Sequence, residues 1–184
     1  KQISNLFDWV LTDFKSVIYI LINHKKDLFS IDNWETVTKT LDNKWIVKNK
    51  KFYFLSLHDA DSQLSEVEAI QLVSDKYKRR LHRFINHLKN ENSIHFIGTY
   101  DTCNPIYEGN NIITSNDLIE FQRVINTIRN KPYKITLILE DISHINPIMF
   151  HSNTVQIINS NEYFIKDWYR FHFDWKKILS RVND

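Results

Sequence analysis

The residue types best suited to acid–base or nucleophilic chemistry occur in four short polar segments, each of which follows an apolar run. They are His58-Asp59-Ala60-Asp61, Asp101-Thr102-Cys103-Asn104, Glu140-Asp141 with Ser143 and His144, and Asn159-Ser160-Asn161. If the apolar runs are parallel strands of one sheet, these segments meet at its carboxyl edge, where open α/β sheets bind ligands. The pattern predicts a hydrolytic or transfer site at that edge. The alternative is that the loops are polar because they face water.

His58 is the strongest single candidate in these segments. An imidazole at a strand end beside carboxylates can act as a general base near neutral pH. We therefore predict a catalytic group of His58, Asp59 and Asp101, although the side chains of neighbouring residues do not face each other. The alternative is a histidine whose ring caps a loop.

Cys103 is the only cysteine in the chain. It would act as a nucleophile only if a base reached it and its thiolate were stabilised, and a lone cysteine is otherwise a small buried hydrophobe. We place Cys103 and Glu140 among the substrate-binding residues of the same edge. Asp59, Asp61 and Asp101 could gather around a divalent ion with Asp141, but no spacing typical of a metal site occurs, so we predict neither a metal nor a cofactor.

A basic stripe on a predicted helix is the second candidate for ligand binding. Arg79, Arg80 and Arg83 follow Lys76 at helical spacing, and guanidinium groups bind phosphates or acidic glycans through paired hydrogen bonds. The alternative is a helix face that is simply solvated. The five tryptophans could stack on sugar rings, or they could build the core.

Hydrophobic periodicity predicts the elements that would position these residues. We expect a helix over 12–22 capped by Thr12 or Asp13, a hairpin of strands 45–47 and 52–57, a helix over 74–90 capped by Ser74 or Asp75, a strand over 94–99, a helix beginning near Asp117, strands over 135–139 and 155–158, and an aromatic helix over 174–182. The alternation of strands and helices predicts βαβ crossovers. The expected fold class is three-layer α/β, a mainly parallel sheet flanked by helices with the hairpin at one edge.

Length and composition narrow the class of protein. At 184 residues the chain suits a single α/β domain spanning 1–184, and its 42% hydrophobic residues exclude wholesale disorder. Because it begins with Lys1, we expect a short N-terminal segment of the parent protein to be missing. Two glycines in the whole chain exclude glycine-rich phosphate loops.

Charge and cysteine content bear on partners and compartment. A formal net charge of +2 gives no broad positive field, so we expect no nucleic-acid partner, and no apolar run is long enough for a membrane span. A single cysteine forbids an internal disulfide, which favours a cytoplasmic location. The oligomeric state is not encoded in these features.

Five short motifs together resemble one known family. They are Phe7-Asp8-Trp9, His58-Asp59, Lys78-Arg79-Arg80 with Arg83-Phe84, the run 94–97, and Asp167-Trp168 followed by Trp175. In this order they look like the DUF1796 family of bacteria and large DNA viruses, whose members carry the label of papain-like cysteine peptidases. The resemblance covers roughly residues 5–180.

The resemblance implies a cysteine-type hydrolase or acyl-transfer domain, in a host cytoplasm or virion if viral, with His58 as base and Asp59 as its companion. Its members carry their cysteine in a Ser-Leu-Gly-x-x-Cys segment just before the Phe-Asp-Trp motif, and that segment is absent here. The nucleophile role therefore does not pass to Cys103. Papain-like folds also contain an antiparallel barrel, whereas this sequence predicts βαβ units. Two alternatives stay open: a carbohydrate-linked domain related to sugar-nucleotide transferases, and a noncatalytic interaction module. The substrate would be a peptide or a glycan.

Overall fold

The computed structural model describes residues 6–7, 10–100, 112–139, 142–146, 149–150, 154–159 and 180. Within it the chain packs as two compact units. The first comprises Lys1–Glu91 and Ile119–Asn130, and the second comprises Asn92–Leu118 and Lys131–Asp184. The single domain stays a prediction, and the predicted helix over 174–182 lies outside the described residues apart from Ser180, which is helical.

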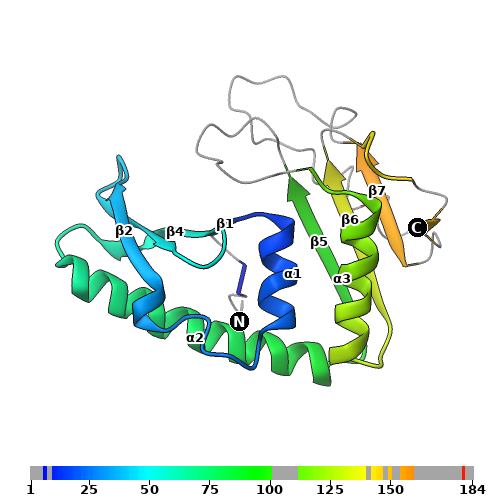
Figure 1. Cartoon of the computed structure of the whole chain (residues 1–184), viewed down its shortest axis with the longest axis horizontal. Helices are drawn as coiled ribbons and strands as arrows, with labels where there is room; N and C mark the ends of the chain where they lie inside the picture. The colour runs from blue at the N-terminus through cyan, green and yellow to red at the C-terminus, as the bar shows by residue number, and fades with distance from the viewer. Residues whose placement is uncertain are drawn as a thin grey trace. The chain divides into compact units, whose positions relative to one another are not determined.

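The described elements follow one another in mixed α/β order. They are β1 (Val10–Thr12), α1 (Phe14–Ile22), a short 3-10 turn (Ile31–Asn33), β2 (Trp34–Lys39), β3 (Lys44–Asn49), β4 (Phe54–Asp61), α2 (Glu66–Asn90), β5 (Ile94–Tyr100), α3 (Ser115–Ile128), β6 (Tyr133–Leu139) and β7 (Val155–Asn159). Figure 1 shows these elements along the chain. The α/β class is confirmed.

The strands form two sheets rather than one. A four-stranded sheet in the order β1-β4-β3-β2 is antiparallel throughout, and a three-stranded sheet in the order β5-β6-β7 is parallel throughout. The prediction of one mainly parallel three-layer sheet is therefore wrong. The hairpin of β3 and β4 is confirmed, but β4 pairs with β3 and β1 and belongs to another sheet than β5.

Three of the apolar runs predicted as parallel strands pair as expected. Ile94 lies opposite Tyr133 at the start of the β5–β6 ladder, and Ile135 lies opposite Val155 in the β6–β7 ladder. In sequence, α3 lies between β5 and β6, as a parallel connection requires. The helix begins at Ser115, because Thr114 rather than Asp117 is its cap: the Thr114 hydroxyl accepts a hydrogen bond from the Asp117 backbone amide.

The strand β4 continues four residues beyond the predicted end at Leu57. Phe54, Leu55 and Ser56 are buried, whereas His58 and Asp61 are exposed. One side of this part of the strand faces solvent, so its sequence becomes polar without the strand ending. His58 and Asp59 consequently lie within a strand and do not follow one.

The N-terminal cap of α2 lies at Ser65, nine residues before the predicted cap at Ser74. Ser65 and Glu68 form a capping box, in which each side chain accepts a hydrogen bond from the other residue's backbone amide. Ser74 is instead buried within the helix and donates its hydroxyl to the Phe29 carbonyl at 2.6 Å. The predicted apolar stripe is confirmed at Tyr77, Leu81, Ile85 and Leu88, all buried.

A cluster of aromatic rings joins α2 to the four-stranded sheet in the first unit. Phe29, Trp34, Phe54 and Tyr77 are at most 3% exposed, and the ring centroids of Phe54 and Tyr77 lie 4.9 Å apart. Figure 1 shows α2 running along this sheet. The cluster fixes the orientation of α2 relative to the four-stranded sheet, through contacts between residues that are distant in sequence.

The C-terminal end of α2 is fixed by an arginine from much later in the chain. Arg129, which is 4% exposed, donates an Nη1 hydrogen bond to the Leu88 carbonyl at 2.8 Å. The last carbonyls of a helix have no partner within it, so this guanidinium satisfies one of them.

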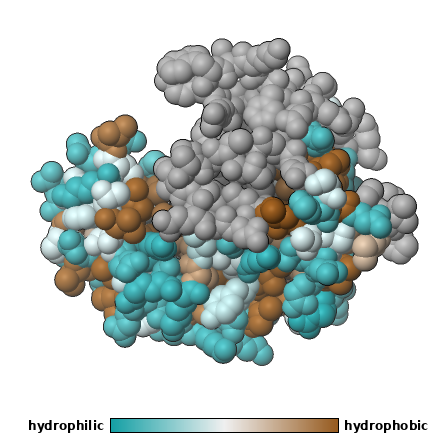
Figure 2. All heavy atoms as spheres, turned by 45° about the horizontal axis from the view of Figure 1, so that its top comes forward, coloured by the Kyte–Doolittle hydropathy of each residue, from teal (hydrophilic) through white to brown (hydrophobic). Residues whose placement is uncertain are grey.

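Figure 2 shows a mainly hydrophilic described surface with scattered hydrophobic residues. In the described part of the chain, no helix combines the length and the apolar character of a membrane span.

Candidate functional site

The Asp59 carboxylate is the centre of a partly buried polar network in the first unit. It accepts hydrogen bonds from the Ser56 hydroxyl at 2.7 Å, from the Tyr77 hydroxyl and from the Lys76 ammonium group. Arg80 in turn donates to the Tyr77 hydroxyl at 3.4 Å, and its guanidinium lies 5.2 Å from the Tyr77 ring centroid. One carboxylate thus binds three donor side chains, one from β4 and two from α2.

These contacts determine the protonation states of the network. Burial by itself would raise the pKa of Asp59, but hydrogen bonds from Lys76, Tyr77 and Ser56 outweigh it and hold that pKa below its ordinary value. Burial, and then the negative charge of Asp59, raise the pKa of Tyr77 above its ordinary value. At neutral pH the network therefore contains an ionised aspartate and a protonated tyrosine, which is an arrangement that stabilises a fold.

His58 does not share this environment. It is exposed, whereas the Asp59 side chain is only 6% exposed, and successive side chains of a strand point to opposite faces of the sheet. Asp59 therefore does not orient the His58 ring, and its oxygens are already engaged by three donors. The predicted pair has no geometry of a catalytic dyad.

The other residues predicted for the same edge cannot be placed beside His58. Asp101, Cys103, Glu140 and Asp141 lie outside the described residues. The strands that precede Asp101 and Glu140 belong to the parallel sheet, whereas His58 belongs to the antiparallel one. The prediction that all four segments meet at the edge of one parallel sheet is wrong, because the described strands form two separate sheets.

The predicted basic stripe on α2 divides into exposed and buried members. Arg79 and Arg83 are exposed, whereas Arg80 is 5% exposed and is engaged with Tyr77. Arg80 is therefore not available to a ligand in the way the stripe predicted. The motif residue Phe84 is half-buried and makes an edge contact with the Phe7 ring at 5.3 Å.

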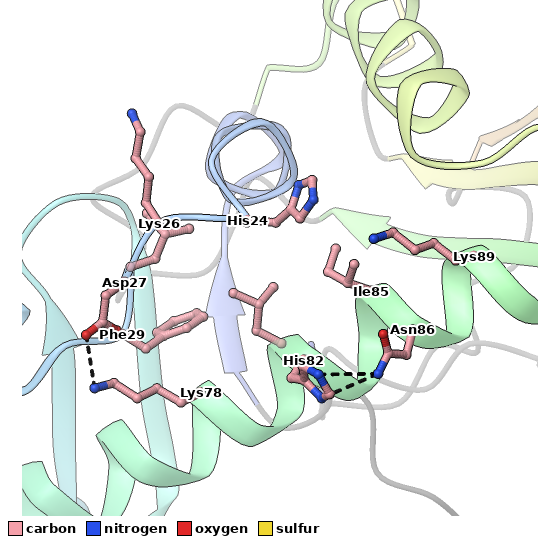
Figure 3. A pocket seen from close by; sticks show the side chains of 11 residues that line it. His24, Lys26, Asp27, Phe29, Lys78, His82, Ile85, Asn86 and Lys89 are labelled. Carbon is pink, nitrogen blue, oxygen red and sulfur yellow. Dashed lines mark hydrogen bonds and ion pairs between the residues drawn. The ribbon is translucent and has the colours of Figure 1, made fainter.

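A cavity of about 530 Å³ lies elsewhere in the first unit, between α2 and the segment that follows α1. The segment contributes His24, Lys26, Asp27, Leu28 and Phe29, and α2 contributes Lys78, Leu81, His82, Ile85, Asn86 and Lys89. We call this cavity the α2 pocket. Figure 3 shows the side chains that line it.

The charge of the α2 pocket is positive. Its lining contains three lysines and one carboxylate, Asp27, a formal balance of +2. Lys78 forms an exposed ion pair with Asp27 at 3.2 Å. Lys89 has no carboxylate within ion-pair distance among the described residues. In Figure 3 its ammonium group points back over Ile85, whereas Lys26 extends away from α2.

Two imidazoles add hydrogen-bonding capacity to the same wall. The Nδ1 atom of His24 lies 2.7 Å from the Leu21 carbonyl, and because a carbonyl only accepts, this nitrogen carries the proton. The Nε2 atom of His24 is the one left for a ligand. His82 lies one helical turn from Asn86, whose amide approaches its ring at 3.4 Å.

The pocket residues escaped the sequence reasoning for an identifiable reason. The predicted site residues lie at strand ends or are arginines. Lys78, His82 and Lys89 are neither, but they recur at intervals of four and seven residues, which places them on one face of a helix. The signal was therefore present in the sequence, directly beside the residues that were chosen. His24 and Lys26 follow the end of a predicted helix and carry no comparable spacing.

Metal and covalent chemistry have no built site in this part of the molecule. The described residues contain no group of three or more histidine, cysteine or acidic side chains that could hold a metal ion. The α2 pocket can instead supply the ammonium donors of its lysines to an anion, above an apolar floor.

Comparisons with known proteins add nothing to this picture. No family model matches the chain, and no match was found among the curated proteins or the solved structures. The resemblance to the DUF1796 family stays a prediction.

Proposed function

We propose that the chain is a binding module that holds a small anionic group, a phosphate in particular, in the α2 pocket. The observation that carries this proposal is the ammonium group of Lys89, which points back over Ile85 in a cavity whose single lining carboxylate, Asp27, is paired with Lys78. A phosphate ester carries a charge of about −1.5 to −2 at neutral pH, which complements the formal balance of the lining.

The energetics favour modest, salt-dependent affinity. Lys78 and Lys89 are exposed, and an exposed ion pair contributes about 0.2–1 kcal/mol. Lys78 must also share its charge with Asp27. We expect binding to weaken as ionic strength rises, because exposed charges are screened within about 10 Å at 0.1 M salt.

Titration calorimetry with pyrophosphate tests the proposal on matched variants. Lys89→Gln and Lys78→Gln should each weaken binding about twofold to fivefold, because each removes one exposed charge. Arg83→Gln and Arg79→Gln remove one exposed charge each from the same helix without touching the pocket lining, and they should leave the affinity within twofold. Asp27→Asn should tighten binding about twofold, since it releases Lys78 from its ion pair.

The same set of variants separates the two basic surfaces of α2. If Arg79→Gln and Arg83→Gln weakened binding more than the two lysine variants, the exposed arginines would be the ligand site and the proposal would be wrong. Absence of any heat or thermal stabilisation with pyrophosphate would also refute it, because a ligand at 100 times its dissociation constant stabilises a fold by about 2.7 kcal/mol.

The hydrolase alternative stays a prediction, and the described residues offer it little support. Its base would be His58, which lies on an exposed strand face, and its companion Asp59 is engaged by three donors. A His58→Ala variant separates the alternatives, because the α2 pocket does not include this residue.

A further inference from the structure

The floor of the α2 pocket differs in chemistry from its rim. Leu28, Phe29, Leu81 and Ile85 line the cavity, and each is at most 7% exposed. They are therefore core side chains that show only one surface to the cavity. None of them carries a hydrogen-bonding side-chain group.

The polar groups of the lining lie around this floor. In Figure 3 the ammonium group of Lys89 points back over Ile85, whereas that of Lys78 points away from Ile85 and toward Asp27. An anion held by either ammonium group thus sits at the rim, and any part of the ligand that extends inward lies over aliphatic and aromatic carbon.

The cavity has room for more than a phosphate group. A volume of about 530 Å³ falls within the range of roughly 300–1,000 Å³ that holds organic ligands, and it is far larger than a phosphate group needs. A sugar in this space would bury hydroxyl groups against a floor that offers no partner, which costs free energy. An apolar group would instead gain from burial.

We infer that the ligand of the α2 pocket is an amphiphilic phosphate ester, in which a phosphate lies at the rim beside Lys89 and an aryl or short alkyl group lies on the floor formed by Leu28, Phe29, Leu81 and Ile85. This inference rests on the proposed function, and it narrows the ligand class away from sugar phosphates.

Titration calorimetry of the unmodified chain with three probes tests the inference. Inorganic phosphate, phenyl phosphate and glucose 1-phosphate have similar anionic groups and differ in what they carry. Phenyl phosphate should bind about tenfold more tightly than inorganic phosphate, which corresponds to burial of roughly 50–60 Å² of apolar surface. Glucose 1-phosphate should bind no more tightly than inorganic phosphate. The binding of phenyl phosphate should also show the more negative heat-capacity change.

A floor variant provides the matched comparison. Ile85→Thr places a hydroxyl in the floor and should reduce the preference for phenyl phosphate to about threefold. Ile70→Thr alters a half-buried residue of α2 that does not line the pocket, so it should leave the preference unchanged. If Ile85→Thr does not fold, the heat-capacity comparison on the unmodified chain decides the question alone.

The outcomes distinguish the inference from the proposal beneath it. Equal affinity for phenyl phosphate and inorganic phosphate, or tighter binding of glucose 1-phosphate, overturns the amphiphilic ligand and leaves an anion site in place. Failure of all three probes to bind overturns both. A phenyl preference that survives Ile85→Thr unchanged places the apolar group somewhere other than this floor and also overturns the inference.

Discussion

Replacement of Asp59 by asparagine removes the one negative charge of the buried network while keeping the shape of the side chain. In the native chain this carboxylate accepts hydrogen bonds from Ser56, Lys76 and Tyr77. Asparagine has one acceptor oxygen and one donor group, so at least one of the three donors loses its partner. Tyr77 is fully buried and has the most to lose, because water cannot reach it to compensate.

The magnitude follows from the exposure of the partners. Breaking a fully buried ion pair costs about 3–5 kcal/mol, but the Lys76 side chain is 30% exposed and can turn to solvent. A hydrogen bond to a charged group contributes about 1.5–3 kcal/mol, and we expect Asp59→Asn to lower the free energy of unfolding by about 2 kcal/mol. For a chain of this size that corresponds to a fall in Tm of about 4–8 °C.

Urea unfolding followed by tryptophan fluorescence measures this change, with Asp61→Asn as the control. Asp61 lies two residues away in β4 and pairs with Lys44 at 2.9 Å, but both side chains are substantially exposed. Its replacement should change the free energy of unfolding far less than Asp59→Asn does, because solvent screens an exposed ion pair. Equal effects of the two substitutions would refute the view that Asp59 organises a buried network.

The pH dependence gives the prediction its sign. The pKa of Asp59 is lower in the folded chain than its ordinary value of 3.8, so its stabilising contribution is complete above that value and is lost as pH falls through the folded-state pKa. The difference in stability between the native chain and Asp59→Asn should therefore be constant above about pH 5 and should shrink below about pH 4. A difference that grew on acidification would contradict the assigned direction of the shift.

Two further substitutions test other parts of the structure. Ser65→Ala removes the capping box of α2 and should lower the free energy of unfolding by about 1 kcal/mol in the same urea assay, whereas Ser62→Ala, nearby but outside the box, should have little effect. His58→Ala alters an exposed strand residue and should change stability by less than about 0.5 kcal/mol and leave pyrophosphate affinity within twofold; a loss of pyrophosphate binding would place the site near β4.

Local periodicity was sufficient to predict the elements with strong apolar patterns. Asp13 caps α1 as one of the two residues proposed, and its carboxylate accepts from the Ser16 amide at 2.6 Å. The pairing of β3 with β4 also follows from neighbouring sequence, because a hairpin needs only a short turn. These features depend on interactions between residues close in the chain.

Features that depend on distant contacts were not predictable. The start of α2 is an exception, because Ser65 and Glu68 have capping-box spacing and the buried Ala69 and Val73 extend the apolar stripe to Tyr77, so local sequence also indicates a cap at Ser65 rather than Ser74. Five of the six residues of β2 are exposed or half-exposed. The strand lies at the edge of its sheet, so its sequence shows no alternation of apolar and polar residues. The choice between one sheet and two depends on which strand flanks β4, which no local pattern records.

The candidate site shows the same division. The sequence predicted a basic stripe on α2, but one of its arginines, Arg80, is buried and engaged with Tyr77. The pocket also requires the segment His24–Phe29, which contacts α2 through the stacking of Phe29 near Tyr77, the Ser74 hydrogen bond and the Lys78–Asp27 ion pair. Its existence is a property of tertiary packing, and the spacing of lysine and histidine in α2 supplies only half of it.

The hydrogen bond from Arg129 to Leu88 makes the end of α2 depend on a residue that is synthesised much later. Lys89 is the residue after Leu88, so the helical turn that presents its ammonium group is held by a residue that leaves the ribosome about forty positions later. Until then the last turn of α2 is free to fray, as helix ends do. A nascent chain that ends before Arg129 would therefore lack the residue that anchors the helical turn next to Lys89.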